Sequence, residues 1–100
     1  MVSQLRIYTI NKGKLDEFVE GWKKFVYPLH YKHGFTIDRA DVIRERNEFV
    51  WIVSYDGPED WEAKQKAYYG SPERHAVSPD PAQHIAKTER WMIESVLPAK

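Results

Sequence analysis

The stretch EFVWIVSYDGPEDWEA, residues 48 to 63, decides the fold class. Its first half is rich in β-branched and aromatic side chains, and alternate positions divide these side chains between two faces. One face carries Phe49, Trp51, Val53 and Tyr55, and the other carries Val50, Ile52 and Ser54. Because both faces are largely apolar, residues 48 to 56 are predicted to form a central strand that is covered on both sides.

A helix is predicted directly after this strand. The run DGP at residues 56 to 58 is a helix-start signal, and the acidic residues that follow it suit the positive end of a helix dipole. Gly70 is a natural stop signal. We therefore expect a helix that ends near Tyr69 and buries Trp61 together with Tyr68 or Tyr69.

Upstream of this pair, the chain predicts a strand, a helix and a second strand. Residues 3 to 10 alternate between two faces, one with Arg6, Tyr8 and Ile10 and the other with Leu5, Ile7 and Thr9. Apolar residues then recur at steps of three and four across residues 11 to 34, which predicts an amphipathic helix. Pro28 is expected to kink or end it near Tyr27.

The remaining segments complete a repeated strand and helix order. Residues 35 to 43 read as a strand, 44 to 47 as a polar turn, and 88 to 98 as the last strand. The proline-rich stretch between residues 71 and 87 predicts two short helical turns, because Ser71-Pro72 and Asp80-Pro81 each resemble a cap followed by a first helical residue.

This order is β-α-β followed by β-α-β, which is typical of a ferredoxin-like α+β fold with a four-stranded antiparallel sheet. Helices on one face leave the other face of the sheet open. Leu5, Ile7, Val50 and Ile52 make that face apolar, so we expect a second copy of the chain to cover it. The predicted assembly is a homodimer.

Length and composition exclude several classes of protein. A chain of 100 residues with 30% charged residues forms one domain, residues 1 to 100, of a soluble globular protein. Fifteen basic residues balance fifteen acidic ones, so no nucleic-acid partner and no membrane surface are predicted. The chain has no cysteine and begins with a strand, which is typical of a cytoplasmic protein.

Aromatic residues make up 14% of the chain, and they suit either a core or a pocket for a flat apolar ligand. Trp51 and Tyr55, on the central strand, are the candidates to line such a pocket, and Trp61 on the following helix is a third. Arg6 and Tyr8 share a strand face and are further candidates to bind a ligand. Arg6 is expected to hold an anionic group of a ligand or, preferably, to pair with Glu94, and Arg39 is expected to pair with Asp41.

The stretch AYYGSPERHAV, residues 67 to 77, sets a phenol and an imidazole close together. Here His75 is the candidate general base, and Tyr69 is the candidate donor to a developing oxyanion. The alternative is an exposed histidine on a short turn and a half-buried tyrosine at a helix end. His30 and His33 are spaced as a metal-binding pair would be, but no third ligand is evident, so no metal site is predicted.

Three stretches resemble the NIPSNAP family. They are LRIYTINKGKLDEFVEGW at residues 5 to 22, KHGF at 32 to 35 and NEFVWIVSYDGPEDWEA at 47 to 63. The resemblance implies the dimeric α+β barrel class, whose members include cofactor-free monooxygenases, isomerases, polyketide cyclases, haem enzymes and proteins without known activity. The order Tyr69, Pro72, His75 is also similar to a Tyr and His pattern in cyclases of this class.

We therefore expect a small homodimeric barrel that binds an apolar or aromatic small molecule and performs proton transfer without a cofactor, as an isomerase, cyclase or lyase does. Two alternatives stay open. One is a cofactor-free monooxygenase of phenolic substrates, and the other is a barrel that binds a ligand or a protein without catalysis.

Overall fold

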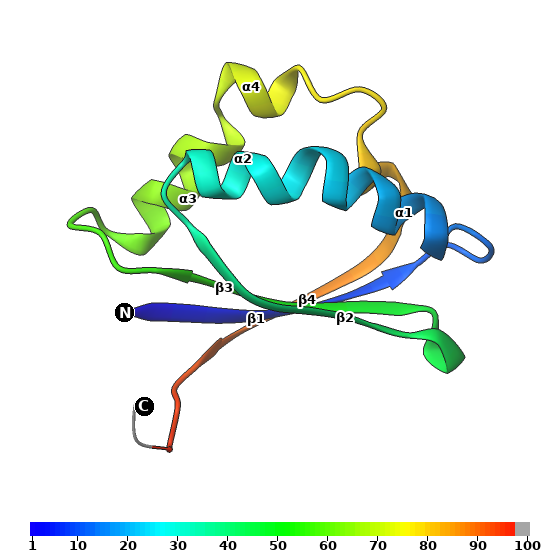
Figure 1. The fold of residues 1–100 in the computed structure, drawn as a ribbon, viewed down its shortest axis with the longest axis horizontal. Coiled ribbons are helices and arrows are strands. Elements are labelled where there is room, and N and C mark those ends of the chain that lie inside the picture. Colours follow the sequence, from blue (N-terminus) through cyan, green and yellow to red (C-terminus); the bar gives the residue numbers. More distant parts are fainter. Residues whose placement is uncertain (98–100) are drawn as a thin grey trace.

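The computed structural model describes residues 1–97 of the chain. Its four strands form one antiparallel sheet in the order β2-β3-β1-β4, and the α-helices lie on one face of it (Figure 1). The strands are β1 (Val2–Ile10), β2 (Thr36–Ile43), β3 (Glu48–Tyr55) and β4 (Ile85–Ile93). This arrangement confirms the ferredoxin-like α+β fold that was predicted from the order of strands and helices.

The central pair of strands places the predicted faces as expected. Arg6 on β1 lies opposite Trp51 on β3, and Leu5 lies opposite Ile52. Since side chains alternate along a strand, this register puts Arg6 and Trp51 under the helices and leaves Leu5 and Ile52 on the open face. The helix-facing residues of β3, and those of β1 from Arg6 onward, are buried, including Tyr8.

The first helical segment runs without a break through the position where a kink was predicted. It consists of α1 (Leu15–Gly21), a π-helical turn (Trp22–Val26) and α2 (Tyr27–Lys32). The wider turn lies directly before Pro28, whose ring nitrogen cannot donate a hydrogen bond. The α-helical pattern gives way to the π turn after Gly21 and resumes at Tyr27, so the helix does not end near Tyr27. It continues because the π turn accommodates the missing donor.

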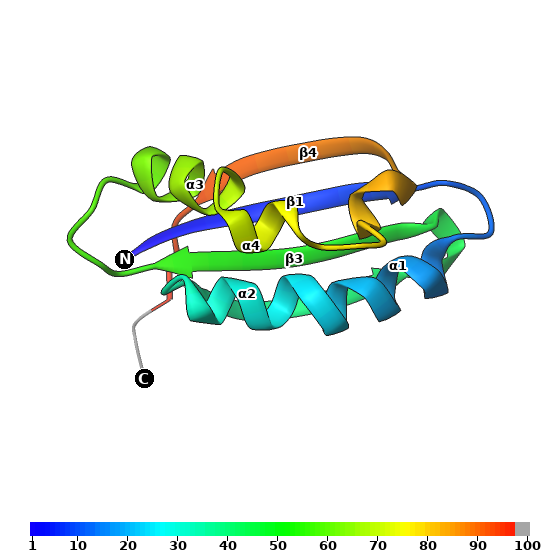
Figure 2. The same cartoon turned by 90° about the horizontal axis from the view of Figure 1, so that it is seen from above.

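The second helical segment is divided by caps. It comprises α3 (Trp61–Tyr69), α4 (Pro72–His75) and a 3-10 turn (Pro81–His84). Asp60 caps α3 by accepting a hydrogen bond from the Ala63 amide, and Ser71 caps α4 by accepting one from the Arg74 amide. Viewed from above, the α1 and α2 segment lies along β3, and α3 lies beside it on the side of β1 and β4 (Figure 2).

The last strand differs from its predicted bounds at both ends. β4 begins three residues earlier than residue 88, because Ile85 already pairs with Ile10 of β1. It ends at Ile93, which pairs with Ser3 near the start of β1. An edge strand has only one neighbour, so its ladder stops where that neighbour stops; the predicted end at residue 98 lies outside the described residues.

The core is aromatic, and it lies between the sheet and the helices. Phe18 packs edge to face against Tyr8, and Trp22 packs in the same way against Trp51, with ring centroids 5.9 and 5.4 Å apart. On the opposite side of the sheet, Trp91 is 58% exposed. No helix within residues 1–97 is long and apolar enough to cross a membrane.

Candidate functional site

A cavity with a free volume of about 80 Å³ lies between the sheet and the helices. β1 and β3 form its floor, and α2, α3 and α4 contribute to its walls. Its aromatic lining is Tyr8, Phe18, Trp22, Trp51, Tyr68 and Tyr69. Among the residues that line it, the charged ones are Arg74 and Arg90, and no carboxylate is present.

His30 is the one histidine that lines this cavity, and its side chain is fully buried. Its Nδ1 lies 2.9 Å from the backbone oxygen of Val26. Because a carbonyl only accepts hydrogen bonds, Nδ1 carries the hydrogen, and in the neutral ring Nε2 carries a lone pair. Nε2 is buried and has no partner within residues 1–97.

The surroundings keep the imidazole of His30 neutral. Burial lowers its pKa to about 3, and the positive charges of Arg6 and Arg74 lower it as well, against the opposing effect of the hydrogen bond to Val26. The ring is therefore neutral at every physiological pH, and its Nε2 is available to accept a hydrogen bond.

Three further buried polar atoms, on residues that line the cavity, lack a partner in the described part of the chain. They are Nε1 of Trp22, Nε1 of Trp51 and the hydroxyl of Tyr68. Burial raises the pKa of Tyr68, so its phenol keeps its hydrogen. Folded proteins pair nearly all of their buried polar groups, and four unpaired groups on residues around a single cavity make this cavity the candidate site.

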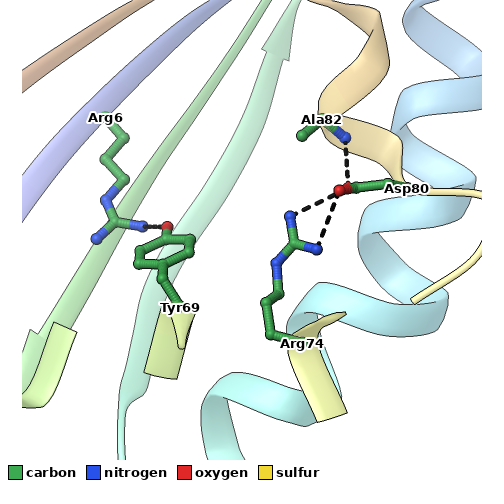
Figure 3. A network of polar contacts seen from close by, with 5 residues as sticks. All are labelled: Arg6, Tyr69, Arg74, Asp80 and Ala82. Atoms are coloured by element: carbon green, nitrogen blue, oxygen red, sulfur yellow. Dashed lines mark hydrogen bonds and ion pairs between the residues drawn. The ribbon is translucent and has the colours of Figure 1, made fainter. Parts of the chain in front are cut away.

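Arg6 lies fully buried behind Tyr69 (Figure 3). Its Nη1 donates to the Tyr69 hydroxyl at 3.0 Å, its Nη2 to Gln65 at 2.7 Å and its Nε to Gln4 at 2.8 Å. The guanidinium lies 4.8 Å from the ring centroid of Trp51. Since the Tyr69 oxygen accepts from Arg6, its own hydrogen is free to point at a ligand.

The predicted ion pair between Arg6 and Glu94 is wrong. All three partners of Arg6 are neutral, and within residues 1–97 no carboxylate pairs with it. Glu94 follows the last residue of β4 and is exposed, whereas Arg6 lies under the helices. The predicted pair between Arg39 and Asp41 is confirmed, with Nε and Oδ2 2.6 Å apart.

Arg74 and Asp80 close one wall of the cavity through a two-pronged ion pair (Figure 3). The two nitrogens of the fork lie 3.1 and 3.0 Å from the carboxylate oxygens. Asp80 also accepts a hydrogen bond from the Ala82 amide at 2.9 Å. Burial opposes ionisation of Asp80, but these hydrogen bonds outweigh it and hold its pKa below the usual value. The pair ties α4 to the turn before β4.

The structure gathers some of the predicted site residues and separates others. Trp51, Tyr8 and Tyr69 line the cavity. Trp61 lines a second hollow beside it, which shares Tyr69 with the cavity. Tyr55 is buried elsewhere in the core, and its hydroxyl donates to Glu59.

His75 does not join Tyr69 at the cavity. It is exposed on α4 and is absent from the lining of both hollows, whereas its neighbour Arg74 lines the cavity. Successive residues on a helix point about 100° apart. A catalytic role for His75 stays a prediction, because His75 does not line the cavity with Tyr69.

His30 was missed as a site residue by sequence reasoning, which considered it only with His33 as a metal pair. The described residues contain no group of three or more potential metal ligands. A signal was nevertheless present, because Phe18, Trp22, Val26 and His30 follow one another at steps of four along one helix face. That spacing places His30 on the buried stripe.

The fold and the aromatic cavity together define a class, the ferredoxin-like α+β domains with one sheet face covered by helices. Among solved structures, a NIPSNAP domain protein from Burkholderia xenovorans matches with a TM-score of 0.79 at 19% identity, over 99% of this chain and 95% of that one. A NIPSNAP family protein from Agrobacterium tumefaciens matches with a TM-score of 0.80 at 16% identity, over 98% and 92%.

A second group of neighbours includes an antibiotic biosynthesis monooxygenase, with a TM-score of 0.66 at 13% identity over 97% of this chain and 100% of that one. No family model and no curated protein matches the sequence. The similarity to NIPSNAP domain proteins is confirmed at the level of the fold. At these identities it shows the fold alone.

Proposed function

We propose that this protein binds a small apolar or aromatic molecule with its reacting group in the cavity and moves a proton on it without a cofactor. The observation that carries the proposal is that four unpaired polar atoms belong to residues that line one aromatic cavity, with Nε2 of His30 among them. The proposed base is therefore His30, in place of His75.

The proposed chemistry uses one acceptor and several donors. Nε2 of His30 accepts a proton from a C–H bond beside a carbonyl group, and the electron pair of that bond moves onto the carbonyl oxygen as an enolate. The indole N–H groups of Trp22 and Trp51 and the hydroxyl of Tyr69 are the donors available to the oxygen. Return of the proton to a different atom completes an isomerisation.

The charges around the cavity favour this direction of charge movement. Arg6 and Arg74 lower the pKa of His30 in the free protein, which makes it a weak base. When the substrate becomes an anion, the same two positive charges stabilise it, and the anion in turn raises the pKa of His30. Proton transfer then gives an imidazolium and enolate pair inside a cavity of low polarity.

A monooxygenase that needs no cofactor is the second candidate, and the antibiotic biosynthesis monooxygenase among the structural neighbours supports it. In this reaction His30 would take the proton of a phenol, and the phenolate would supply the electrons that reduce O₂. One oxygen atom would enter the product and the other would leave as water.

We also propose that two copies pair through the open face of the sheet. Leu5 and Ile7 on β1 and Val50 and Ile52 on β3 form the centre of this face and are only partly covered. Trp91 on β4, opposite Leu5, extends it and is largely exposed. A contiguous apolar face of this kind is typical of an interface between subunits.

Hydrogen and deuterium exchange tests the proton transfer. Acetophenone, phenylacetone and phenylpyruvate carry enolisable C–H bonds near an aromatic ring, and loss of these proton signals in D₂O can be followed by NMR. We expect the protein to accelerate exchange of at least one of them, His30→Gln to lower the rate at least ~100-fold, and His75→Gln to leave it unchanged.

The outcomes separate the candidates. Binding without accelerated exchange of any of the three compounds would contradict proton transfer and favour a barrel that only binds. Oxygen consumption with a phenolic substrate, lost in His30→Gln, would favour the monooxygenase. A rate that depends on His75 and not on His30 would reassign the base.

A further inference from the structure

A second hollow lies directly outside the cavity, and we call it the outer groove. Its free volume is about 600 Å³, and its apolar lining comes from Val2, Trp61 and Met92. Tyr69 and Arg90 line both the cavity and the outer groove, so these two side chains form the boundary between them. The guanidinium of Arg90 lies 5.8 Å from the ring centroid of Tyr69.

The two hollows differ in size, so each can hold a different part of one ligand. A cavity of about 80 Å³ holds a small polar group and too little else for a complete substrate of ordinary size. The outer groove has room for the remainder. The groove is lined by both acidic and basic residues, Glu62 and Lys66 among them, so it has no strong preference for a charge of one sign. Its apolar side chains therefore dominate its choice of ligand.

Two arginines on neighbouring strands make the surroundings of the cavity positive. Arg6 of β1 and Arg90 of β4 lie directly opposite each other in the strand register. Like charges at opposed positions repel one another. Neither forms an ion pair with a carboxylate of residues 1–97, since Arg6 bonds to neutral groups and Arg90 stacks near Tyr69. Arg90 lines both the cavity and the outer groove, whereas Arg6 is fully buried and lines neither. A negative group bound beside Arg90 would offset this repulsion.

From these observations we infer that the cavity and the outer groove form one site for an amphiphilic anion. A carboxylate or enolate head enters the cavity beside Arg90 and Tyr69, and an apolar tail lies in the outer groove against Trp61 and Met92. This inference rests on the proposal that the cavity is the ligand site, and it names the substrate class as acids with an aromatic or aliphatic tail. It does not depend on catalysis.

Three probes with one skeleton and different heads test the charge preference. They are 3-phenylpropanoate, 3-phenylpropanol and 3-phenylpropylamine, and binding is measured by isothermal titration calorimetry. We expect the acid to bind at least ~10-fold more tightly than the alcohol, because charge-assisted hydrogen bonds are about twice as strong as neutral ones. The amine should bind most weakly.

Variants assign the head and the tail. Arg90→Gln should remove the preference for the acid over the alcohol, and Arg90→Lys should keep most of it. Met92 is 54% exposed, so Met92→Ser can fold normally, and because it removes apolar surface without adding a charge it should weaken binding of the acid and the alcohol alike. The matched control is Lys87→Gln, which removes a positive charge from the opposite face of the same strand. It should change neither the preference for the acid nor the affinity for the two probes.

The results distinguish this inference from the proposed function. Equal affinity for the acid and the alcohol, or no binding of any of the three probes, would overturn the inference. A preference for the acid that survives Arg90→Gln would also overturn it. Tight, Arg90-dependent binding of the acid in a protein that catalyses no deuterium exchange would support the inference and contradict the proposed catalysis.

Discussion

At the scale of single residues, His30 is expected to make the protein sensitive to acid. Its pKa is about 3 in the folded protein, whereas an imidazole in an unfolded chain has a pKa near 6.5. Between these two values the unfolded chain binds one more proton. The free energy of unfolding is therefore unaffected by protonation of His30 above about pH 6.5, and it falls by roughly 1.4 kcal/mol per pH unit as the pH decreases towards 3.

Urea unfolding between pH 7 and pH 4.5 measures this effect. In His30→Gln, the slope of the unfolding free energy against pH should correspond to about one proton fewer bound on unfolding than in the parent protein. In His75→Gln, on the exposed side of α4, the slope should equal that of the parent protein. An unchanged slope in His30→Gln would show that other groups account for the acid sensitivity.

Arg6 and Tyr69 are expected to be energetically coupled. A double-mutant cycle with Arg6→Met and Tyr69→Phe should give a coupling free energy of about 1–3 kcal/mol, because the bond joins a fully buried guanidinium to a phenol. The exposed pair Arg39 and Asp41 provides the comparison, with an expected coupling below ~1 kcal/mol. Equal couplings would contradict the special role of the buried bond.

At the scale of elements, Ser71 holds the junction between α3 and α4. Its hydroxyl donates to the Tyr68 carbonyl at 2.7 Å and accepts from the Arg74 amide at 3.2 Å. Two residues that line the cavity are thus joined through one buried side chain. Ser71→Ala is expected to lower the free energy of unfolding by about 1–2 kcal/mol.

The control is Ser78→Ala, at an exposed serine of the same loop, which should change stability by less than about 0.5 kcal/mol. Thermal and urea unfolding would measure both variants. Ser71→Asp keeps the acceptor and loses the donor, so it should fall between the parent and Ser71→Ala. An effect of Ser71→Ala no larger than that of Ser78→Ala would contradict the proposed junction.

At the scale of the whole molecule, the open face of the sheet is expected to pair two chains of 11.8 kDa each. Ile52→Lys places a charge at the centre of this face, opposite Leu5, and should give a folded monomer because the helix-facing core is untouched. Light scattering coupled to size exclusion measures the mass. Tyr27→Lys, an exposed aromatic on the helical side, should remain a dimer. A monomeric parent protein would contradict the pairing.

The arrangement of elements could be read largely from local sequence. A period of two in residues 48 to 56 and steps of three and four in residues 11 to 34 predicted a strand and a helix, and the structure contains both. The passage through Pro28 and the early start of β4 were not predicted, because they depend on the π-helical turn and on pairing with β1.

The candidate site shows the same division. The alternation along β1 and β3 put Arg6, Tyr8 and Trp51 on one face, and these residues do meet under the helices. The sequence by itself therefore determined the order of the elements and the side chains that face the core, since both follow from short-range periodicity. Which histidine reaches the cavity, and whether Arg6 meets Glu94 or Tyr69, was decided only by the tertiary structure. Those contacts join residues far apart in the chain, and their geometry depends on how the helices dock on the sheet.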